Sequence, residues 1–321
     1  MKAIVQDRYG PSEVLRLTEV AIPELEPDSV LVRVRAASVN AYDWHMMRGE
    51  PFLVRLTEGL RRPKAALPGV DLAGVVEAVG SDVTEFKAGD EVFGARSGAF
   101  REFVRGRARN FHPKPAGITF EQGAALPMAG VTALQALRDK GQVKAGQSVL
   151  ITGAAGGVGT MAVQIAKAFG AQVTAVCGPR SVDLVRSIGA DQVIDYSRED
   201  YTRTADRYDL IIDVASTRSL RDNRCILRPN GTLVIVGARR TNMVMIGARL
   251  IWAVVLSKVG KQRFLPFLAS NSRENHAVLA ELAEAGKLTP VIDSTYPLAE
   301  TAEAVRHQEQ DHPQGKVVIT V

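Results

Sequence analysis

The sequence predicts an α/β fold with a doubly wound parallel sheet, joined to a second region that is rich in β-strands. Three observations support this prediction. Five apolar segments between residues 148 and 237 alternate with helical patterns, as in a parallel sheet covered on both faces. A cluster of glycines separates the first segment from the helix after it. Before residue 120, apolar and polar residues alternate with the period of a strand.

The N-terminal region has the pattern of a small antiparallel barrel or sandwich. In "VLVRVRAAS", residues 30–38, valine and alanine alternate with Arg33 and Arg35, which indicates a strand with one wet face. Residues 74–80 and 90–94 are further short strand candidates, each closed by glycine. Short strands with frequent turns favour a barrel or a sandwich.

The middle of the chain alternates strictly between the two element types. The predicted strands are residues 148–153, 172–177, 192–195, 209–213 and 232–237. The predicted helices between them are residues 157–169, 181–188 and 219–227. A helix, a turn and a second helix are expected across residues 119–139, and the tail is expected to hold one helix, residues 276–286, before a terminal strand.

Composition restricts the classes of function. The chain has 321 residues, enough for two domains, and its net charge of +5 is spread along its length. No basic block with interleaved aromatics occurs, so nucleic-acid binding is not expected. Two cysteines do not form a disulfide framework, and the first residues have no apolar signal core, so a cytoplasmic location is expected.

The most apolar window is "MVMIGARLIWAVVLS", residues 243–257. Arg249 interrupts it, and it is shorter than the roughly 20 residues that a membrane span needs. A buried or half-buried helix is therefore expected. Attachment to a membrane surface is the alternative, because Lys258, Lys261 and Arg263 lie close by.

The glycine cluster "GAAGGVGT" lies between a strand and a helix, which is the context that a dinucleotide-binding turn requires. Met161, Ile165 and Phe169 follow on one helical face that can pack on the sheet. A tight turn alone is the alternative interpretation. The residues assigned to the cofactor here are Ala154, which replaces the usual first glycine, Gly156, Gly157, Val158, Gly159 and, at the end of the fifth predicted strand, Gly237.

The end of the second strand indicates which dinucleotide binds. An NAD site usually has a carboxylate there for the ribose 2′-hydroxyl, but this chain has "CGPRS". Arg180 can hold a 2′-phosphate, with Gly178 and Ser181 beside it and Tyr196 placed to stack or hydrogen-bond nearby. NADPH is therefore predicted; in the alternative interpretation, Arg180 only begins the next helix in solvent.

The chain resembles the medium-chain dehydrogenase/reductase superfamily, in its zinc-free quinone oxidoreductase and enone reductase branch. The resemblance is carried by "ASVNAYDWHMMRG", "LPGVDLAGVVEAVGSDVTEFKAGDEVFG", "GAFREFV", "AALPMAGVTALQAL", "ITGAAGGVGTMAVQIAKAFGA", "IGADQVIDY" and "GKVVITV". It implies a GroES-like catalytic domain from residues 1–122 and 269–321, a Rossmann NADPH-binding domain from residues 123–268, and a substrate cleft between them. Relatives often dimerise, so a homodimer is slightly favoured.

The chain departs from the zinc-dependent members of that superfamily. Where they have metal ligands, this chain reads "SVNAYD" and "GVDLAG", without cysteine or histidine, and the four-cysteine lobe is missing. The five histidines show no ligand spacing. No metal site is therefore expected, and reduction of an enone, a reactive alkenal or a quinone is more plausible than oxidation of a simple alcohol.

The candidate catalytic residues lie mainly in "VNAYDWHMMRG". Asn40 could donate to a substrate carbonyl oxygen or fix a ribose hydroxyl, and the phenol of Tyr42 could also donate. His45 could supply a proton, but a single histidine is more often structural or solvated, and that is the alternative. Asp43 and Asp71 are expected to support the fold. By resemblance, Thr132 lies beside the nicotinamide and Asn271 belongs to a segment that closes over the cofactor. An NADPH-binding structural or redox-sensing protein with little turnover is the alternative function.

Overall fold

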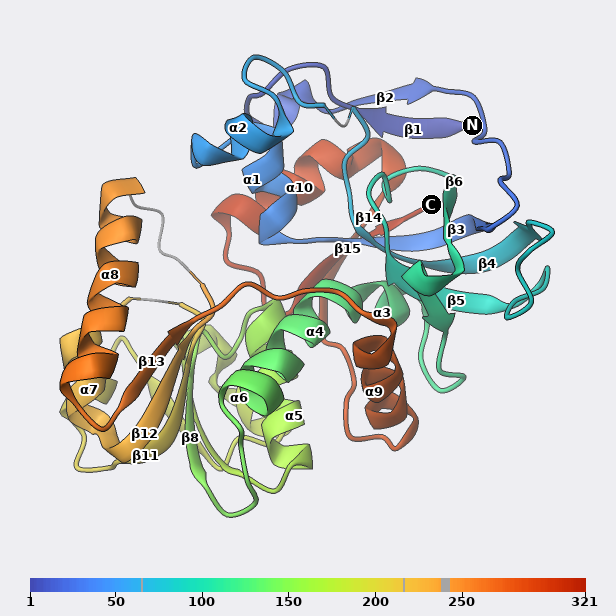
Figure 1. Ribbon diagram of the computed structural model, residues 1–321. Coiled ribbons are helices and arrows are strands. Elements are labelled where there is room, and N and C mark those ends of the chain that lie inside the picture. Colours follow the sequence, from blue (N-terminus) through green and yellow to red (C-terminus); the bar gives the residue numbers. More distant parts are fainter. Residues whose placement is uncertain (65, 216, 238–242) are drawn as a thin grey trace. The chain divides into compact units, whose positions relative to one another are not determined.

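The computed structural model describes residues 1–64, 66–215, 217–237 and 243–321, and it consists of two compact units (Figure 1). The first unit contains Met1–Ala129 and Asn271–Val321, and the second contains Gly130–Ser270. The chain therefore leaves the first unit, forms the second, and returns to complete the first.

The second unit is built on a six-stranded sheet in the order β10-β9-β8-β11-β12-β13, in which every pair is parallel. The strands are β8 (Ser148–Thr152), β9 (Gln172–Cys177), β10 (Gln192–Asp195), β11 (Tyr208–Asp213), β12 (Leu227–Ile235) and β13 (Arg263–Pro266). This order is that of the doubly wound dinucleotide-binding fold, and the winding reverses between β8 and β11. The prediction of a Rossmann sheet is confirmed.

Helices lie before and between these strands. They are α4 (Pro127–Gln135) with a π-helix at Ala136–Lys140, α5 (Gly157–Ala168), a 3-10 turn at Pro179–Ser181, α6 (Val182–Ser187), a 3-10 turn at Tyr201–Arg203, α7 (Leu220–Ile226) and α8 (Met243–Val259). The side chains of Met161 and Ile165 are fully buried, as the apolar spacing in α5 predicts. Strand β13 was not predicted, because "RFLP" is short and directly follows the apolar helix.

The first unit is organised around a seven-stranded sheet in the order β14-β15-β3-β4-β5-β7, with β6 also pairing with β3. Its strands are β3 (Ser29–Val39), β4 (Asp71–Val79), β5 (Glu91–Ala95), β6 (Phe103–Arg107), β7 (Phe111–Pro113), β14 (Ile292–Pro297) and β15 (Lys316–Thr320), and a separate ribbon pairs β1 (Lys2–Val5) with β2 (Arg16–Glu19). Among the described strands of this sheet, only β14 and β15 pair in parallel. Because β15 pairs with β3, both ends of the chain build one core.

The helices of the first unit are α1 (Ala41–Arg48), α2 (Leu53–Glu58), α3 (Phe120–Ala125), α9 (Arg273–Glu284) and α10 (Thr301–Gln310), with 3-10 turns at Ser12–Val14, Ala108–Asn110 and Leu298–Glu300. The expectation of one helix in the tail was wrong, because α10 is a second one. Its sequence "TAEAVRHQEQ" is mostly polar, but its apolar residues Ala304 and Val305 are buried in the core of the unit. An ion pair attaches it to α1, with 2.6 Å between Arg48 Nε and Glu309 Oε1.

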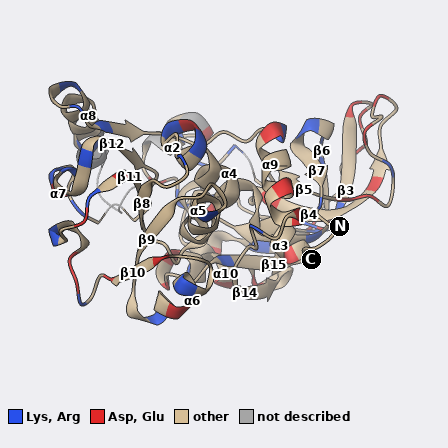
Figure 2. Ribbon diagram, turned by 90° about the horizontal axis from the view of Figure 1, so that it is seen from below, with Lys and Arg blue, Asp and Glu red and all other residues tan. Residues whose placement is uncertain are grey.

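Helix α8 is half-buried, as predicted. Ala253 is fully buried and Leu256 packs against the apolar core of the unit, whereas Ile251 and Trp252 are exposed. Among the described residues, no helix is both long and apolar enough to cross a membrane. Lys and Arg are scattered over both units (Figure 2), in keeping with their spread along the sequence.

Candidate functional site

The turn after β8 brings the main chain of α5 close to the sheet. Gly153 has a φ of +63°, a left-handed conformation that favours glycine. A Cβ on Gly159 would lie 2.1 Å from the carbonyl oxygen of Gly153, so only glycine allows the helix to approach the turn this closely. The buried Ala154 donates its N–H to the carbonyl of Val176 at 3.1 Å, which attaches the turn to β9.

Gly156 differs from Gly159. A Cβ on Gly156 would contact only the carbonyl oxygen of Gly153, at 3.7 Å. Its backbone is extended and forms the N-cap of α5, and Gly157 and Val158 after it are partly exposed. The protein therefore leaves space at the start of a twelve-residue helix, where main-chain N–H groups favour an anion. This space fits the pyrophosphate of a dinucleotide.

The ends of β9 and β10 bring together the residues predicted to bind the adenosine side. A Cβ on Gly178 would lie 3.0 Å from the Tyr196 hydroxyl, so the Tyr196 side chain covers this glycine while remaining 61% exposed. Arg180 is exposed in the following 3-10 turn, and Ser181 is buried. Burial raises the pKa of the neighbouring Cys177 thiol to about 11, so this cysteine stays protonated near neutral pH.

The nearby carboxylate of Asp195, at the end of β10, already has partners. It accepts hydrogen bonds from the N–H of Ser197 at 2.9 Å and from its hydroxyl at 2.7 Å. These hydrogen bonds hold the pKa of Asp195 below its usual range. The residues that directly follow β9 include no acid, as noted from the sequence.

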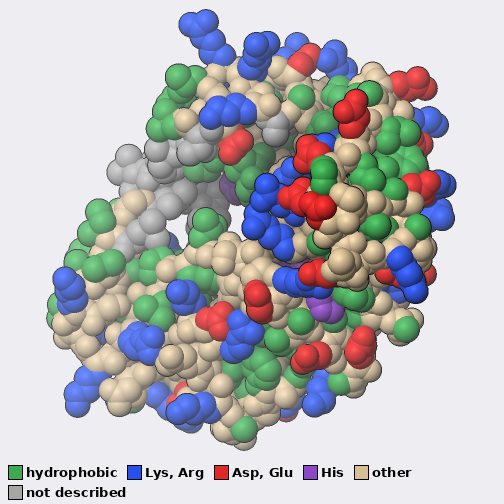
Figure 3. Space-filling view, turned by 45° about the vertical axis from the view of Figure 1, so that its right-hand side comes forward, with side chains coloured by type: hydrophobic (Ala, Val, Ile, Leu, Met, Phe, Trp, Pro, Cys, Tyr) green, Lys and Arg blue, Asp and Glu red, His purple; other side chains and the backbone are tan. Residues whose placement is uncertain are grey.

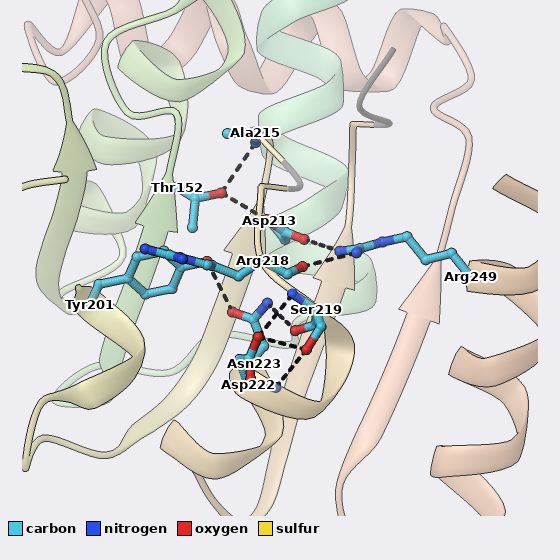
Figure 4. A network of polar contacts seen from close by, with 9 residues as sticks. All are labelled: Thr152, Tyr201, Asp213, Ala215, Arg218, Ser219, Asp222, Asn223 and Arg249. Carbon is cyan, nitrogen blue, oxygen red and sulfur yellow. Dashed lines mark hydrogen bonds and ion pairs between the residues drawn. The ribbon is translucent and has the colours of Figure 1, made fainter. Parts of the chain in front are cut away.

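A buried polar network crosses the point where the winding of the sheet reverses (Figure 4). Thr152, at the end of β8, donates its hydroxyl to the Asp213 carboxylate at the end of β11, over 2.9 Å. The other carboxylate oxygen of Asp213 lies 2.7 Å from Nη2 of Arg249, which extends from α8. The Asp213 side chain is fully buried. The network thus joins β8, β11 and α8.

Gly237 lies where β12 ends beside the end of β11. Its N–H donates to the carbonyl of Asp213 at 3.3 Å, and a Cβ would lie 2.0 Å from the carbonyl oxygen of Val214. The glycine predicted for the cofactor site is therefore required by the fold itself, because two main-chain segments approach closely here.

A second polar cluster lies in the first unit, where β3 runs into α1. The amide of Asn40 donates to Asp71 Oδ2 at 3.0 Å, and its oxygen accepts from Lys316 Nζ at 2.5 Å. The main-chain N–H of Asn40 donates to Asp43 Oδ2 at 2.7 Å, and that of Met128 donates to Asp71 Oδ2 at 3.0 Å. The cluster therefore fixes the start of α1 and the start of α4.

This cluster is almost completely buried, and burial shifts the pKa values of its charged groups. Asp71 is 0% exposed, Asp43 4% and Lys316 3%. Burial raises the pKa of Asp43 to about 7 and that of Asp71 to about 6, and it lowers the pKa of Lys316. Two carboxyl groups share one ammonium, so the cluster takes up a proton more readily than isolated carboxylates would. The expectation that both aspartates support the fold agrees with these contacts.

The structure limits what Asn40 can do for a substrate. Its amide also approaches the carbonyl of Ser38, at 3.4 Å, so both amide hydrogens are directed to groups inside the protein. Asn40 therefore acts here as a positioning residue. Its predicted role as a direct donor would require one of these contacts to break.

Tyr42 and His45 lie three residues apart on α1 and therefore share a face. Tyr42 is 42% exposed, and partial burial with the nearby Glu58 raises the pKa of its phenol. His45 stacks on Trp44, and its Nδ1 lies 2.8 Å from the carbonyl oxygen of Glu50. Because a carbonyl only accepts, Nδ1 carries hydrogen, and Nε2 of the neutral ring is an acceptor.

The remaining predicted residues lie on separate elements. Thr132 is partly exposed on α4, in the second unit, and Asn271 is exposed where the chain re-enters the first unit. Within the second unit, Gln135 exchanges two hydrogen bonds with the main chain of Ser270, which fixes the start of the return segment. The roles of Thr132 and Asn271 stay predictions.

Two family models match the chain. The model described as "Alcohol dehydrogenase GroES-like domain" matches residues 26–116, and the model described as "Zinc-binding dehydrogenase" matches residues 188–319. The latter description names zinc. In the described part of the chain, however, no three His, Cys, Asp or Glu side chains form a group that could hold a metal ion.

Whole-chain comparisons are more specific. The mitochondrial NAD(P)H oxidoreductase RTN4IP1 of Mus musculus is 36% identical over 100% of this chain and 89% of its own length. The quinone oxidoreductase of Rattus norvegicus is 33% identical over 99% of this chain and 96% of its own length. The solved structure of the Coxiella burnetii quinone oxidoreductase superposes with a TM-score of 0.86, at 32% identity and coverage of 100% and 99%.

The chain belongs to the quinone oxidoreductase family of the medium-chain dehydrogenase/reductase superfamily. The resemblance found in the sequence is therefore confirmed, as is the combination of a GroES-like domain with a Rossmann domain. Membership of this family makes the chain an oxidoreductase of the NAD(P)H-dependent class.

Sequence reasoning about this family member missed Lys316 and the pair formed by Asp213 and Arg249. A signal existed for the pair. Asp213 ends a continuously apolar strand and Arg249 interrupts an apolar helix, and a charge in either place needs a buried partner. Lys316 likewise begins the apolar strand "KVVIT", but nothing in the sequence shows that its partners lie near residue 40.

Proposed function

We propose that the protein is an NADPH-dependent, metal-independent reductase that transfers hydride to an enone, a reactive alkenal or a quinone. The observation that carries the proposal is the space beside Gly156 at the start of α5, together with the lack of an acidic residue directly after β9. NADPH supplies the hydride when bound. The N-terminus of α5 would hold the pyrophosphate, and Arg180 would hold the 2′-phosphate.

The protein must stabilise the negative charge that develops on the substrate oxygen and then supply a proton. Tyr42 suits the first task, because its phenol is partly exposed on α1 and carries a hydrogen to donate near neutral pH. His45 suits the second task only as the imidazolium, since Nδ1 is engaged with Glu50 and the neutral Nε2 accepts. The cluster around Asn40 positions α1, on which both side chains lie.

The cofactor assignment is tested by titrating NADPH and NADH into the protein and following the fluorescence of the reduced nicotinamide. We expect NADPH to bind at least about tenfold more tightly, and Arg180→Ala to reduce that preference. Arg198→Ala is a matched control, because Arg198 is also exposed and also follows a strand of this sheet. Tighter binding of NADH would contradict the assignment.

The catalytic assignment is tested with a panel of enones, alkenals and quinones, monitored by NADPH oxidation. Tyr42→Phe and His45→Ala are each expected to lower kcat by about 10- to 100-fold without changing NADPH affinity. Unchanged rates in both variants would remove these residues as candidates. Identification of the product shows whether hydride reaches carbon or oxygen.

A second candidate function is NADPH binding with little turnover, in a structural or redox-sensing role. The contacts of Asn40 favour it, because both amide hydrogens are used inside the protein. Tight NADPH binding without oxidation across the whole panel would support this candidate over the reductase.

The partner proposed is a small-molecule carbonyl compound or quinone. Both cysteines are free, which supports a reducing, cytoplasmic location. A homodimer remains a proposal from the resemblance alone.

A further inference from the structure

Helix α8 carries a continuous apolar stripe on its outer face. Ala248, Ile251, Trp252, Val255 and Val259 follow one another at the three- and four-residue spacing of a single helical face, and all five are exposed. The exposed fractions of the larger side chains are 67% for Ile251, 60% for Trp252 and 73% for Val259. Surface helices of globular proteins usually have polar side chains on this face.

The opposite face of α8 holds the helix firmly to the second unit. Arg249 forms the ion pair with the buried Asp213, Ala253 is fully buried, and the Ser257 hydroxyl accepts from the N–H of Phe264 on β13 at 2.8 Å. The apolar stripe is therefore presented on a fixed helix. Turning the helix to bury the stripe would break the buried ion pair.

The chain around α8 is strongly basic. From residue 223 to residue 270 the sequence contains eight Lys and Arg and no Asp or Glu. Of these, Lys258, Lys261 and Arg263 are exposed at the C-terminal end of α8 and the start of β13. Figure 2 shows Lys and Arg on α7 and α8, and Figure 3 shows hydrophobic side chains beside Lys and Arg on the molecular surface. An acidic surface would complement this charge.

The first unit repeats this composition around α2. Phe52, Leu56 and Leu60 are spaced four residues apart, and each is between 57% and 60% exposed. Arg61, Arg62 and Lys64 follow directly and are exposed. Two segments far apart in the sequence therefore combine exposed apolar side chains with adjacent cations, which is the composition of interfacial membrane-binding segments.

We propose that the outer face of α8 docks onto a lipid surface with anionic headgroups. The stripe would enter the boundary between headgroups and acyl chains, with Trp252 at the depth where tryptophan is enriched, and Lys258, Lys261 and Arg263 would contact the headgroups. A second copy of the chain fits less well, because each copy would bring its own cations to the contact without a carboxylate from this segment. The proposal is independent of the substrate of the enzyme.

The test is co-sedimentation of the full chain with vesicles of phosphatidylcholine, either pure or with about one third phosphatidylglycerol. Binding is expected only to the anionic vesicles, and it should weaken as salt is raised. The double variant Ile251→Ser/Trp252→Ser is expected to lose at least about tenfold in partition. Ile22→Ser is the matched control, because Ile22 is 51% exposed in the other unit. If the parent protein, Ile251→Ser/Trp252→Ser and Ile22→Ser all bind the anionic vesicles equally, the proposal is wrong.

A second measurement reports the position of α8 directly. Vesicles with brominated acyl chains should quench Trp252 but leave the buried Trp44 unquenched, and Trp252→Phe should abolish the quenching while keeping the binding. Sedimentation velocity on the same proteins tests whether a second copy of the chain, and not a lipid surface, covers the stripe. If the chain ignores anionic vesicles and Ile251→Ser/Trp252→Ser converts a dimer to a monomer, the stripe is a contact between copies and the proposal is wrong.

Discussion

Two polar sites of the molecule are built differently. One is the turn between Gly153 and Gly159, and the other is the cluster around Asn40. The turn uses main-chain atoms of seven consecutive residues, and Gly156 leaves space for a ligand at the N-terminus of α5. The cluster uses side chains that are 276 positions apart in the case of Asn40 and Lys316, and they hydrogen-bond to one another inside the protein, although Asp71 Oδ1 has no hydrogen-bond partner. A local main-chain site should therefore tolerate single substitutions better than a closed side-chain cluster.

The largest expected effect is in the cluster. Lys316→Met should lower the free energy of unfolding by about 3–5 kcal/mol, because two buried carboxyl groups lose their only cation in the cluster. Urea denaturation measures the loss. It should shrink at low pH, where the two carboxyl groups are protonated.

Lys258→Met is the control for this substitution, since Lys258 is exposed and should change stability by less than about 0.5 kcal/mol. The double variant Lys316→Met/Asp71→Asn should recover part of the loss. If Lys316→Met is as stable as the parent protein, the cluster does not behave as a closed charged unit.

His276 provides a further comparison with the cluster around Asn40. It is buried in the same unit, but it lacks the hydrogen-bond partners that the side chains of the cluster have. It is 2% exposed on α9, and neither ring nitrogen has a hydrogen-bond partner in the structure. Burial lowers its pKa to about 4. The unfolded chain therefore binds a proton near pH 6.5 while the folded chain does not, and stability falls from that pH down to about 4, by up to about 3 kcal/mol.

His276→Phe should remove this acid-dependent loss and retain the contact with Phe93, whose ring lies 5.5 Å away. The measurement is the free energy of unfolding between pH 4 and pH 7, with the exposed His312→Gln as control. A slope that His276→Phe leaves unchanged would show that another group causes the acid sensitivity.

Gly159→Ala tests the part of the turn that the fold itself requires. The added methyl group would lie 2.1 Å from the Gly153 carbonyl oxygen, so α5 must move, at a cost of about 1–3 kcal/mol. We expect lower stability and weaker NADPH binding together, measured by thermal unfolding and by titration. Normal values for both would mean that the helix is not held by this approach.

Of the two glycine substitutions, Gly156→Ala should change stability less, and it tests directly whether the pyrophosphate of NADPH binds at this position. Its φ of −80° suits alanine and the nearest atom is 3.7 Å away, so stability should change by less than about 1 kcal/mol. NADPH affinity should nevertheless fall by at least about tenfold, because the methyl group occupies the space assigned to the pyrophosphate. Unchanged affinity would falsify that assignment.

The same contrast explains what could be predicted from the sequence. The sheet of the second unit and the glycine turn follow from short-range patterns, because periodicity and glycine placement act within a few residues. The sequence placed Tyr196 near the cofactor but did not show that it covers Gly178. Strand β13 was missed because it has only four residues. Helix α10 was missed because two positions of its buried face, Thr301 and Glu309, are polar.

The charged partners were harder to predict. Arg249 and Asp213 each stand out in the sequence as a charge in an apolar segment, yet only the fold shows that they meet. For the same reason, Asn40 was predicted to be a donor to the substrate, whereas the structure shows it as a positioning residue. A sequence shows that its amide can donate, but not that Asp71 and Lys316 already use it.

The pairing of β15 with β3 has a consequence for how the chain is made. Synthesis proceeds from the N-terminus, and domains generally fold as units as they emerge. The second unit is complete once Ser270 has emerged, whereas the first unit waits for Lys316 and the strand that it begins. Until then Asn40 and the buried carboxyl groups of Asp43 and Asp71 lack the ammonium of Lys316, so we expect the nucleotide-binding half to mature first on the ribosome and the half with the catalytic candidates on α1 to mature last.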